Sequence, residues 1–187
     1  AEVSLTTNTG KTIDTSWTYQ IVNTKIVGTG FTLRGKFTSS LYISGLDIAT
    51  TGGGWNGAAL YLENCALLAV DTCFLSGNAA DIKRAVYVQA ASFIGTWIAI
   101  NVPNTTNNVG AMLADWHTHA WIRQSIVNAP KAGSFGIACG YQSSGLVDRT
   151  HIMAAGTGLR ATTMGIIHRT QLLNEATTPI SPASNPG

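Results

Sequence analysis

Short stretches of alternating apolar and polar residues recur along the chain, and corners rich in glycine, asparagine, proline and serine separate them. Alternation with a period of two is typical of a strand that buries one face. No stretch keeps the 3.6-residue spacing of an amphipathic helix over several turns. The pattern therefore predicts an all-β protein.

The stretches align in two frames that alternate along the chain. The first frame has an apolar start and an aliphatic pair near its end: AVDTCFL (69–75), FIGTWIA (93–99), WIRQSIV (121–127), VDRTHIM (147–153) and IHRTQLL (167–173). A second frame precedes each of these: AALYLEN (58–64), AVYVQAA (85–91), AMLADWH (111–117), FGIACGY (135–141) and GLRATTM (158–164). Successive units start 20 to 28 residues apart, too short for a strand–helix–strand unit with parallel strands.

One such unit per coil predicts a parallel β-helix of about six short coils, in which equivalent residues stack about 4.8 Å apart. A β-sandwich is the alternative, because short strands between turns also suit it. Residues 1–30 are expected to form a cap or attachment segment, and residues 31–175 the β-helix. Residues 176–187 contain three prolines and no apolar periodicity, which predicts an irregular tail.

Composition narrows the class of protein. Charged residues make up 11% and hydrophobic residues 45% of the 187 residues, which suits a folded β-protein rather than a disordered chain. The net charge of +2 gives no argument for nucleic acid, and no apolar run reaches the roughly 18 residues that would predict membrane insertion. The first residues lack the pattern of a signal peptide. Cys65, Cys73 and Cys139 are expected to be buried free thiols.

The stretches LYISGLDI (41–48) and LVDRTHIM (146–153), with their variable corners, resemble the pectate-lyase-like parallel β-helices. Among these, residues 30–175 look most similar to the β-helix domains of bacteriophage tailspikes and tail fibres. The resemblance implies a right-handed β-helix, a homotrimer, and an extracellular place on the phage virion beside other tail proteins. It also implies binding to bacterial capsule or lipopolysaccharide, without a cofactor.

Two other functions stay open. Many members of the resembled family cleave polysaccharide, so a depolymerase acting as a glycoside hydrolase or lyase is one alternative. A structural fibre segment, in which exposed residues serve only subunit contacts, is the other.

The stretch ADWHTHAW (114–121) holds the densest group of candidate binding residues. In the aligned frames it is two residues longer than Val88–Phe93, which predicts an inserted corner that projects from the coil. Flat rings and hydrogen-bonding groups there make carbohydrate-binding candidates of Asp115, Trp116, His117, His119 and Trp121. Packing against another subunit is the alternative. A metal site is not predicted, because the two histidines lack enough neighbouring ligands. Trp55, in the glycine-rich corner 50–57, is a further candidate for sugar contact.

The same alignment places Arg123, Arg149 and Arg169 at one frame position. Three arginines stacked about 5 Å apart would form a basic stripe able to grip acidic groups of a glycan, or would pair with nearby acids such as Asp148 and Glu175. Asp148 and His168 also share a frame position, which makes an ion pair between coils plausible.

Catalytic residues remain unknown, because glycoside hydrolysis needs a pair of carboxylates and no pair stands out. The weak candidates are Asp47, Asp71, Asp115 and Asp148. Asp47 and Asp71 occupy similar places in adjacent units and are expected to stack, although corner capping is the more ordinary role for such residues.

Overall fold

The structure is a computed structural model that describes residues 7–8, 11–14, 17–19, 23–36, 39–52, 57–77, 84–103, 110–162, 164–170, 173–174, 176 and 178–181. Every regular element among these residues is a β-strand, and three long sheets contain nearly all of them. From β4 onward each third strand returns to the same sheet and pairs in parallel with its predecessor. The chain is thus a right-handed parallel β-helix, as predicted, and not a β-sandwich.

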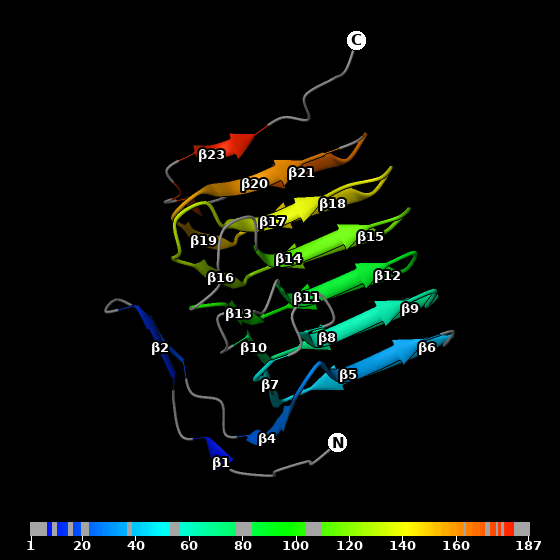
Figure 1. Ribbon diagram of the computed structural model, residues 1–187, viewed down its shortest axis with the longest axis vertical. Coiled ribbons are helices and arrows are strands. Elements are labelled where there is room, and N and C mark those ends of the chain that lie inside the picture. The colour runs from blue at the N-terminus through cyan, green and yellow to red at the C-terminus, as the bar shows by residue number, and fades with distance from the viewer. Residues whose placement is uncertain are drawn as a thin grey trace.

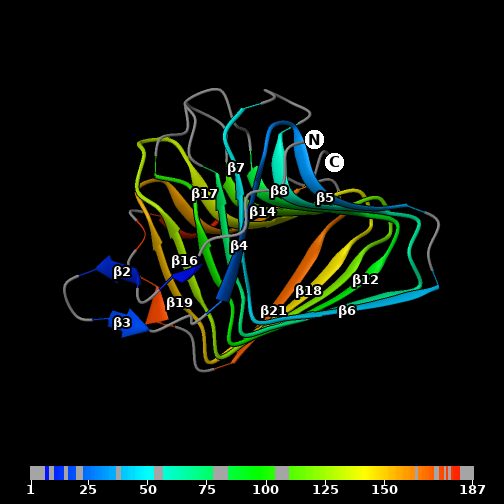
Figure 2. The same ribbon diagram turned by 90° about the horizontal axis from the view of Figure 1, so that it is seen from below.

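The three sheets form the three sides of the coil, which Figure 2 shows along the stack. The eight-stranded sheet contains β1 (Thr7–Asn8), β4 (Asn23–Gly28), β7 (Leu46–Thr50), β10 (Phe74–Gly77), β13 (Ala99–Asn101), β16 (Ile126–Ala129), β19 (His151–Ala154) and β22 (Leu173–Asn174). The seven-stranded sheet contains β5 (Phe31–Lys36), β8 (Ala58–Glu63), β11 (Arg84–Gln89), β14 (Gly110–Asp115), β17 (Phe135–Cys139), β20 (Thr157–Ala161) and β23 (Thr178–Ser181). The six-stranded sheet contains β6 (Ser40–Ser44), β9 (Leu67–Asp71), β12 (Ser92–Thr96), β15 (His119–Arg123), β18 (Ser144–Asp148) and β21 (Ile166–Thr170).

Among the described strands, two pairings are antiparallel. β1 runs antiparallel to β4, and β2 (Lys11–Asp14) forms a hairpin with β3 (Trp17–Tyr19). Both views place this hairpin on the side of the eight-stranded sheet, away from the six-stranded sheet (Figures 1 and 2).

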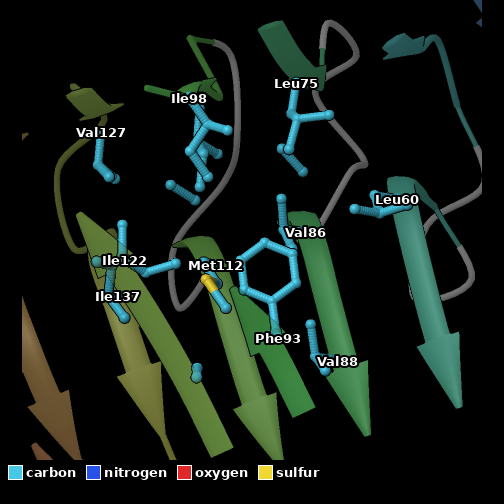
Figure 3. Packing of buried hydrophobic residues seen from close by; sticks show 14 of the residues in the cluster. Leu60, Leu75, Val86, Val88, Phe93, Ile98, Met112, Ile122, Val127 and Ile137 are labelled. Carbon is cyan, nitrogen blue, oxygen red and sulfur yellow. The ribbon is translucent and has the colours of Figure 1, made fainter. Parts of the chain in front are cut away.

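The core fills the space between the three sheets. Each sheet turns alternate residues inward, where equivalent apolar side chains stack from coil to coil: Ile48, Leu75, Ile100, Val127 and Ile152 in the eight-stranded sheet, and Leu60, Val86, Met112, Ile137 and Leu159 in the seven-stranded sheet. Figure 3 shows Phe93 of the six-stranded sheet among these rows, close to Val86, Val88 and Met112. The sheets therefore hold one another through a single apolar core.

The corner between the six-stranded and eight-stranded sheets has the same backbone conformation in successive coils. Its residues share a positive φ, and each donates its backbone N–H to the last strand residue of the next coil: Gly45, Thr72, Trp97, Gln124 and Arg149. The residue that follows turns its side chain inside; the hydroxyls of Ser125 and Thr150, for example, each donate to the carbonyl two residues before. This bend explains how Val147 and Ile152 are both buried although they are five residues apart and strict alternation would place them on opposite faces.

The register predicted by aligning similar letters is wrong by one or two residues. Val147 pairs with Arg169 rather than Ile167, and Trp121 pairs with Leu146 rather than Val147. The true register keeps an inward row of Ile43, Val70, Gly95, Ile122 and Val147. Gly95 obscures this row in the sequence, because the side chains of Ile98 and Phe93 fill the place that its own would take.

The β-helix also extends beyond the predicted boundaries. β4 lies within the expected cap segment, yet it pairs in parallel with β7. β23 lies within the expected irregular tail, yet it pairs in parallel with β20. The proline at position 179 is compatible with a strand at the end of a sheet, where one row of N–H groups has no ladder partner.

Candidate functional site

The outer face of the six-stranded sheet and its two bordering corners carry the exposed apolar side chains of the described residues. Eight of the nine large hydrophobic residues that are highly exposed belong to this face or to its corners: Tyr42, Leu67, Trp97, Trp116, Trp121, Tyr141, Met164 and Ile166. The ninth, Leu41, pairs with buried Leu68 in the inward row and is exposed because β6 is the end strand of its sheet. The described parts of the other two sheets contribute none. The exposed apolar side chains are thus gathered on one side of the described β-helix, which makes this side the candidate binding surface.

A stacked pair of aromatic rings stands at the corner between β14 and β15. Trp116 and Tyr141 occupy equivalent places in successive coils, and their rings lie parallel with centroids 4.6 Å apart and an interplanar angle of 6°. Both side chains are about half exposed, at 47% and 46%. We call residues 115–119 together with Tyr141 the Trp116 corner.

Backbone geometry aims these rings outward. Trp116 and His117 both have positive φ, and the N–H of His117 donates to the carbonyl of Tyr141 at 3.1 Å. One coil earlier, Ala90 occupies the position equivalent to Trp116. Ala90 also has a positive φ, and its N–H donates to the carbonyl of Asp115. Because alanine carries only a methyl group, the face of Trp116 that points away from Tyr141 has no aromatic neighbour in the coil below.

The predicted two-residue insertion at this corner is wrong. Asp115 pairs with Gln89 and His119 pairs with Ser92, so three residues connect β14 to β15 where two connect β11 to β12. Three residues also connect Glu63 to Leu67 in an earlier coil. The corner is therefore of ordinary length, and its side chains project because of positive φ values rather than extra residues.

Polar side chains surround the aromatic pair. His117 and His119 are exposed, and Nδ1 of His119 lies 2.7 Å from the hydroxyl of Ser144 on the next strand. Thr118 is buried between them; its backbone N–H donates to Ser143 Oγ, and its hydroxyl donates to the carbonyl of Asp115. Hydrogen bonds of Thr118 thus hold the corner from inside, while the exposed rings of Trp116 and His117 face solvent.

Asp115 differs from its exposed neighbours because it is 7% exposed. Its Oδ1 atom has no hydrogen-bond partner, and Gly140 lies so near that a Cβ there would come within 3.0 Å of it. Burial raises the pKa of Asp115, although the backbone N–H of Trp116 and the charge of Arg84 act in the opposite direction. The carboxyl group is therefore suited to hold a proton to higher pH than an ordinary aspartate.

The outer face of the seven-stranded sheet holds a polar cluster that the sequence analysis missed. Glu63 Oε2 lies 3.0 Å from Lys36 Nζ and 3.5 Å from a guanidinium nitrogen of Arg34, and it accepts a hydrogen bond from the Tyr61 hydroxyl. The bond from Lys36 is the main cause that lowers the pKa of Glu63. Glu63, Gln89 and Asp115 stand in one row of successive coils.

Arg84 belongs to the same face. Its guanidinium carbon lies 3.8 Å from the centre of the Tyr87 ring, and the residue is 7% exposed. Burial lowers the pKa of this guanidinium. The spacing of RAVYVQ, with Tyr87 three residues after Arg84, was the available signal, but several strands of this chain carry aromatic residues and the spacing alone is not specific.

The predicted stripe of three arginines does not exist. Arg123 pairs with Asp148 in the next coil, Arg149 sits at the following corner, and Arg169 pairs with Val147. Arg123 lies with its guanidinium carbon 5.0 Å from the Trp121 ring centre. The outward row is mixed, with Asp71, Thr96, Arg123, Asp148 and Thr170 in register. The prediction was wrong because the similar sequences around Arg149 and Arg169 were aligned with each other, whereas the strands pair in a different register.

Two predicted acid pairings are also wrong. His168 pairs with Leu146 rather than with Asp148, which instead accepts hydrogen bonds from Thr170 Oγ1 at 2.6 Å and Arg149 Nε at 3.1 Å. The bond from Thr170 is the main cause that lowers the pKa of Asp148. Asp47 and Asp71 lie in different sheets and do not stack. Asp47 is buried, whereas the Asp71 carboxylate accepts a bond from the neighbouring Thr72.

Trp55 lies outside the described residues. The cysteines are free and buried, as predicted. Within the described ranges no three His, Cys, Asp or Glu side chains gather in a way that could hold a metal ion. Nor does the described part of the chain contain a helix that is long and apolar enough to cross a membrane.

Comparisons with known proteins return no match. No family model fits the chain, and neither the curated proteins nor the solved structures contain a significant relative.

Proposed function

We propose that this chain binds bacterial surface polysaccharide and serves as a tailspike or tail-fibre attachment protein of a phage virion. The observation that carries the proposal is the half-exposed aromatic pair at the Trp116 corner, with the small residue Ala90 in the equivalent place one coil earlier. The parallel β-helix supports it as well, since its stacked coils present such side chains along an elongated, rigid surface.

The Trp116 corner suits a pyranose ring. The apolar face of a sugar can lie flat on the exposed indole, while its hydroxyl groups meet donors and acceptors at the rim. His119, in the Trp116 corner, and Ser144, on the neighbouring strand, together offer both kinds of group. Because Tyr141 stacks on the opposite face of Trp116, the indole is already fixed in position, so little side-chain entropy is lost when a ligand binds.

Binding of host polysaccharide to the Trp116→Ala variant tests the proposal. One ring face covers about 60 Å², which at about 25 cal/mol per Å² corresponds to about 1.5 kcal/mol, so affinity should fall roughly tenfold. Trp97→Ala is the matched control, because Trp97 is 60% exposed but stands at the other corner of the same sheet. Isothermal titration calorimetry with purified capsule or lipopolysaccharide fragments gives both affinities.

A tenfold loss confined to Trp116→Ala supports the assignment. Equal affinities for both variants and the unchanged protein would remove the Trp116 corner from the binding site. Absence of binding to every polysaccharide of a susceptible host would leave the structural-segment hypothesis.

Cleavage of the polysaccharide is a second candidate, favoured by the row Glu63–Gln89–Asp115. Two coil steps separate the two acids by about 10 Å between Cα atoms. This is close to the spacing of about 6.5–9.5 Å between the carboxyl groups of inverting glycoside hydrolases. The pKa of Asp115 is raised and that of Glu63 is lowered, as a proton donor beside a charged carboxylate requires.

Release of reducing ends from the bound polysaccharide would establish cleavage. Asp115→Asn should abolish it while leaving polysaccharide binding in place, because the amide cannot supply the proton. Binding without any release of reducing ends rejects this second candidate and leaves the attachment function intact.

A further inference from the structure

Four residues stand one above another at the corner that leads from the seven-stranded to the six-stranded sheet. They follow equivalent positions in successive coils and have φ values of 52°, 48°, 51° and 40°, and they are Asn64, Ala90, Trp116 and Tyr141. We call them the Trp116 column. Because strands in neighbouring coils lie about 4.8 Å apart, each member of the column is about that far from the next.

The indole of Trp116 has one covered face and one face that points toward Ala90. Its ring centre lies 4.6 Å from that of Tyr141, close to the coil rise of about 4.8 Å, so the two rings stack along the axis of the β-helix. Tyr141 therefore covers one indole face, yet Trp116 is 47% exposed. Most of this exposed area must lie on the ring edges and on the face toward Ala90, because a methyl group is too small to cover an indole.

Asn64 stands two coil rises, or about 10 Å, from Trp116 on the side of this second face. It is exposed, and its side chain makes no hydrogen bond to another described residue. A primary amide offers two donors and one acceptor oxygen. A pyranose that lies against the indole would come between Trp116 and Asn64, with its hydroxyl groups within reach of the amide.

The charges near the column disfavour an acidic sugar. At the level of Ala90 the preceding residue, at the end of β11, is an uncharged glutamine. In the same row Asp115 and Glu63 stand one coil rise away on either side. The exposed cations that the structure describes on this sheet at that end, Lys36 and Arg34, lie two rises away and contact Glu63 at 3.0 and 3.5 Å. A sugar carboxylate would thus meet two acids before an exposed cation, and a carboxylate desolvated without a counter-charge is costly.

We infer that the Trp116 corner takes an uncharged pyranose, with Ala90 and Asn64 as its specificity-determining residues. The sugar ring lies against the indole over Ala90, and Asn64 exchanges hydrogen bonds with its hydroxyl groups. This rests on the proposed binding of polysaccharide and deepens it, because it names the class of sugar and the residues that select it.

An NMR titration tests the class of sugar. The indole N–H signal of Trp116 is identified by its absence in the Trp116→Ala variant. Methyl glycosides of glucose, galactose, mannose and N-acetylglucosamine are compared with methyl glucuronide and methyl galacturonide, each up to about 100 mM because single sugars bind weakly. At least one uncharged glycoside should shift the signal, and neither uronide should. A uronide that shifts it as strongly as the best uncharged glycoside, or no shift with any glycoside, overturns the inference.

Two substitutions test the selecting residues, with calorimetry on host polysaccharide fragments as the measurement. Ala90→Tyr places a ring beneath the indole at a φ that Tyr141 already adopts, so it should weaken binding about tenfold, as loss of the indole face would. Asn64→Ala removes about one hydrogen bond to the sugar and should weaken binding about fivefold. Gln142→Ala is the matched control, because Gln142 is also an exposed amide at positive φ but lies beyond Tyr141, and it should leave the affinity unchanged.

Circular dichroism of each variant confirms that it is folded before its affinity is interpreted. Binding that is lost in Trp116→Ala but unaffected by Ala90→Tyr and Asn64→Ala overturns the inference and leaves the proposed function in place. Losses of equal size in Asn64→Ala and Gln142→Ala overturn the role of Asn64. Absence of binding to every host polysaccharide overturns the inference together with the proposed function.

Discussion

Replacing Phe93 by alanine should destabilise the protein by about 4 kcal/mol. The ring is 1% exposed and lies within the core beside Val86 and Met112 (Figure 3). Removing it forfeits roughly 150 Å² of buried apolar area, or about 4 kcal/mol at 25 cal/mol per Å², within the range of about 3–5 kcal/mol for Phe→Ala in cores. The backbone ladders on both sides of β12 hinder collapse of the cavity.

Ile94→Ala is the matched control on the same strand. Ile94 is the next residue, but its side chain points outward and is half-buried, so truncation should cost about 1 kcal/mol or less. Denaturant titration followed by circular dichroism measures both changes. The two substitutions differ mainly in which face of the strand they alter.

This comparison tests the register of the β-helix. The cost of Phe93→Ala should exceed that of Ile94→Ala by about 3 kcal/mol, because about 4 kcal/mol is expected for the first and about 1 kcal/mol or less for the second. Equal costs, or a larger cost at Ile94, would mean that β12 turns its other face to the core, and the outward rows of the six-stranded sheet would then be misassigned.

Other predictions concern individual groups. The three buried thiols, including Cys139 with its pKa raised by burial to about 12, should resist Ellman's reagent in the native protein and all react in guanidinium; fast native reaction would contradict their burial. Burial and the bond to Glu63 raise the pKa of Tyr61 to about 12, so its contribution to stability is complete below pH 10 and is lost as the pH rises toward 12; ultraviolet titration should show this ionisation, and Glu63→Gln should lower its pKa. Thr170→Val should raise the pKa of Asp148 toward its ordinary value in a carboxyl NMR titration, and an unchanged pKa would contradict the assigned hydrogen bond.

Sequence alone was sufficient for the architecture because the coils repeat a backbone pattern. Alternating apolar residues between glycine-rich and asparagine-rich corners, at spacings too short for helices, left the parallel β-helix as the simplest solution. The bend between Val147 and Ile152 could also be predicted, since strict alternation cannot bury both.

Register could not be predicted in the same way. Corner lengths vary from coil to coil, and an inward Gly95 or Gly145 does not look like a core residue in the sequence. Similar letters, such as Arg149–Thr150 and Arg169–Thr170, then suggested a ladder of arginines that the strand pairing does not support. An error of one residue in register exchanges the two faces of a strand.

Only part of the candidate site could be predicted from the sequence, because the rest depends on the strand register. The Trp116 corner was found because its aromatic and histidine residues are adjacent in sequence. The stacking of Trp116 on Tyr141, and the row of Glu63, Gln89 and Asp115, join residues that are 25 to 52 positions apart, and only the register brings them together.

A crystal structure of the protein with an oligosaccharide of its host polysaccharide would show whether the Trp116 corner holds sugar. We expect a pyranose ring lying parallel to the Trp116 indole, on the face away from Tyr141 and above Ala90. An oligosaccharide bound elsewhere on the chain, with that indole face uncovered, would contradict it.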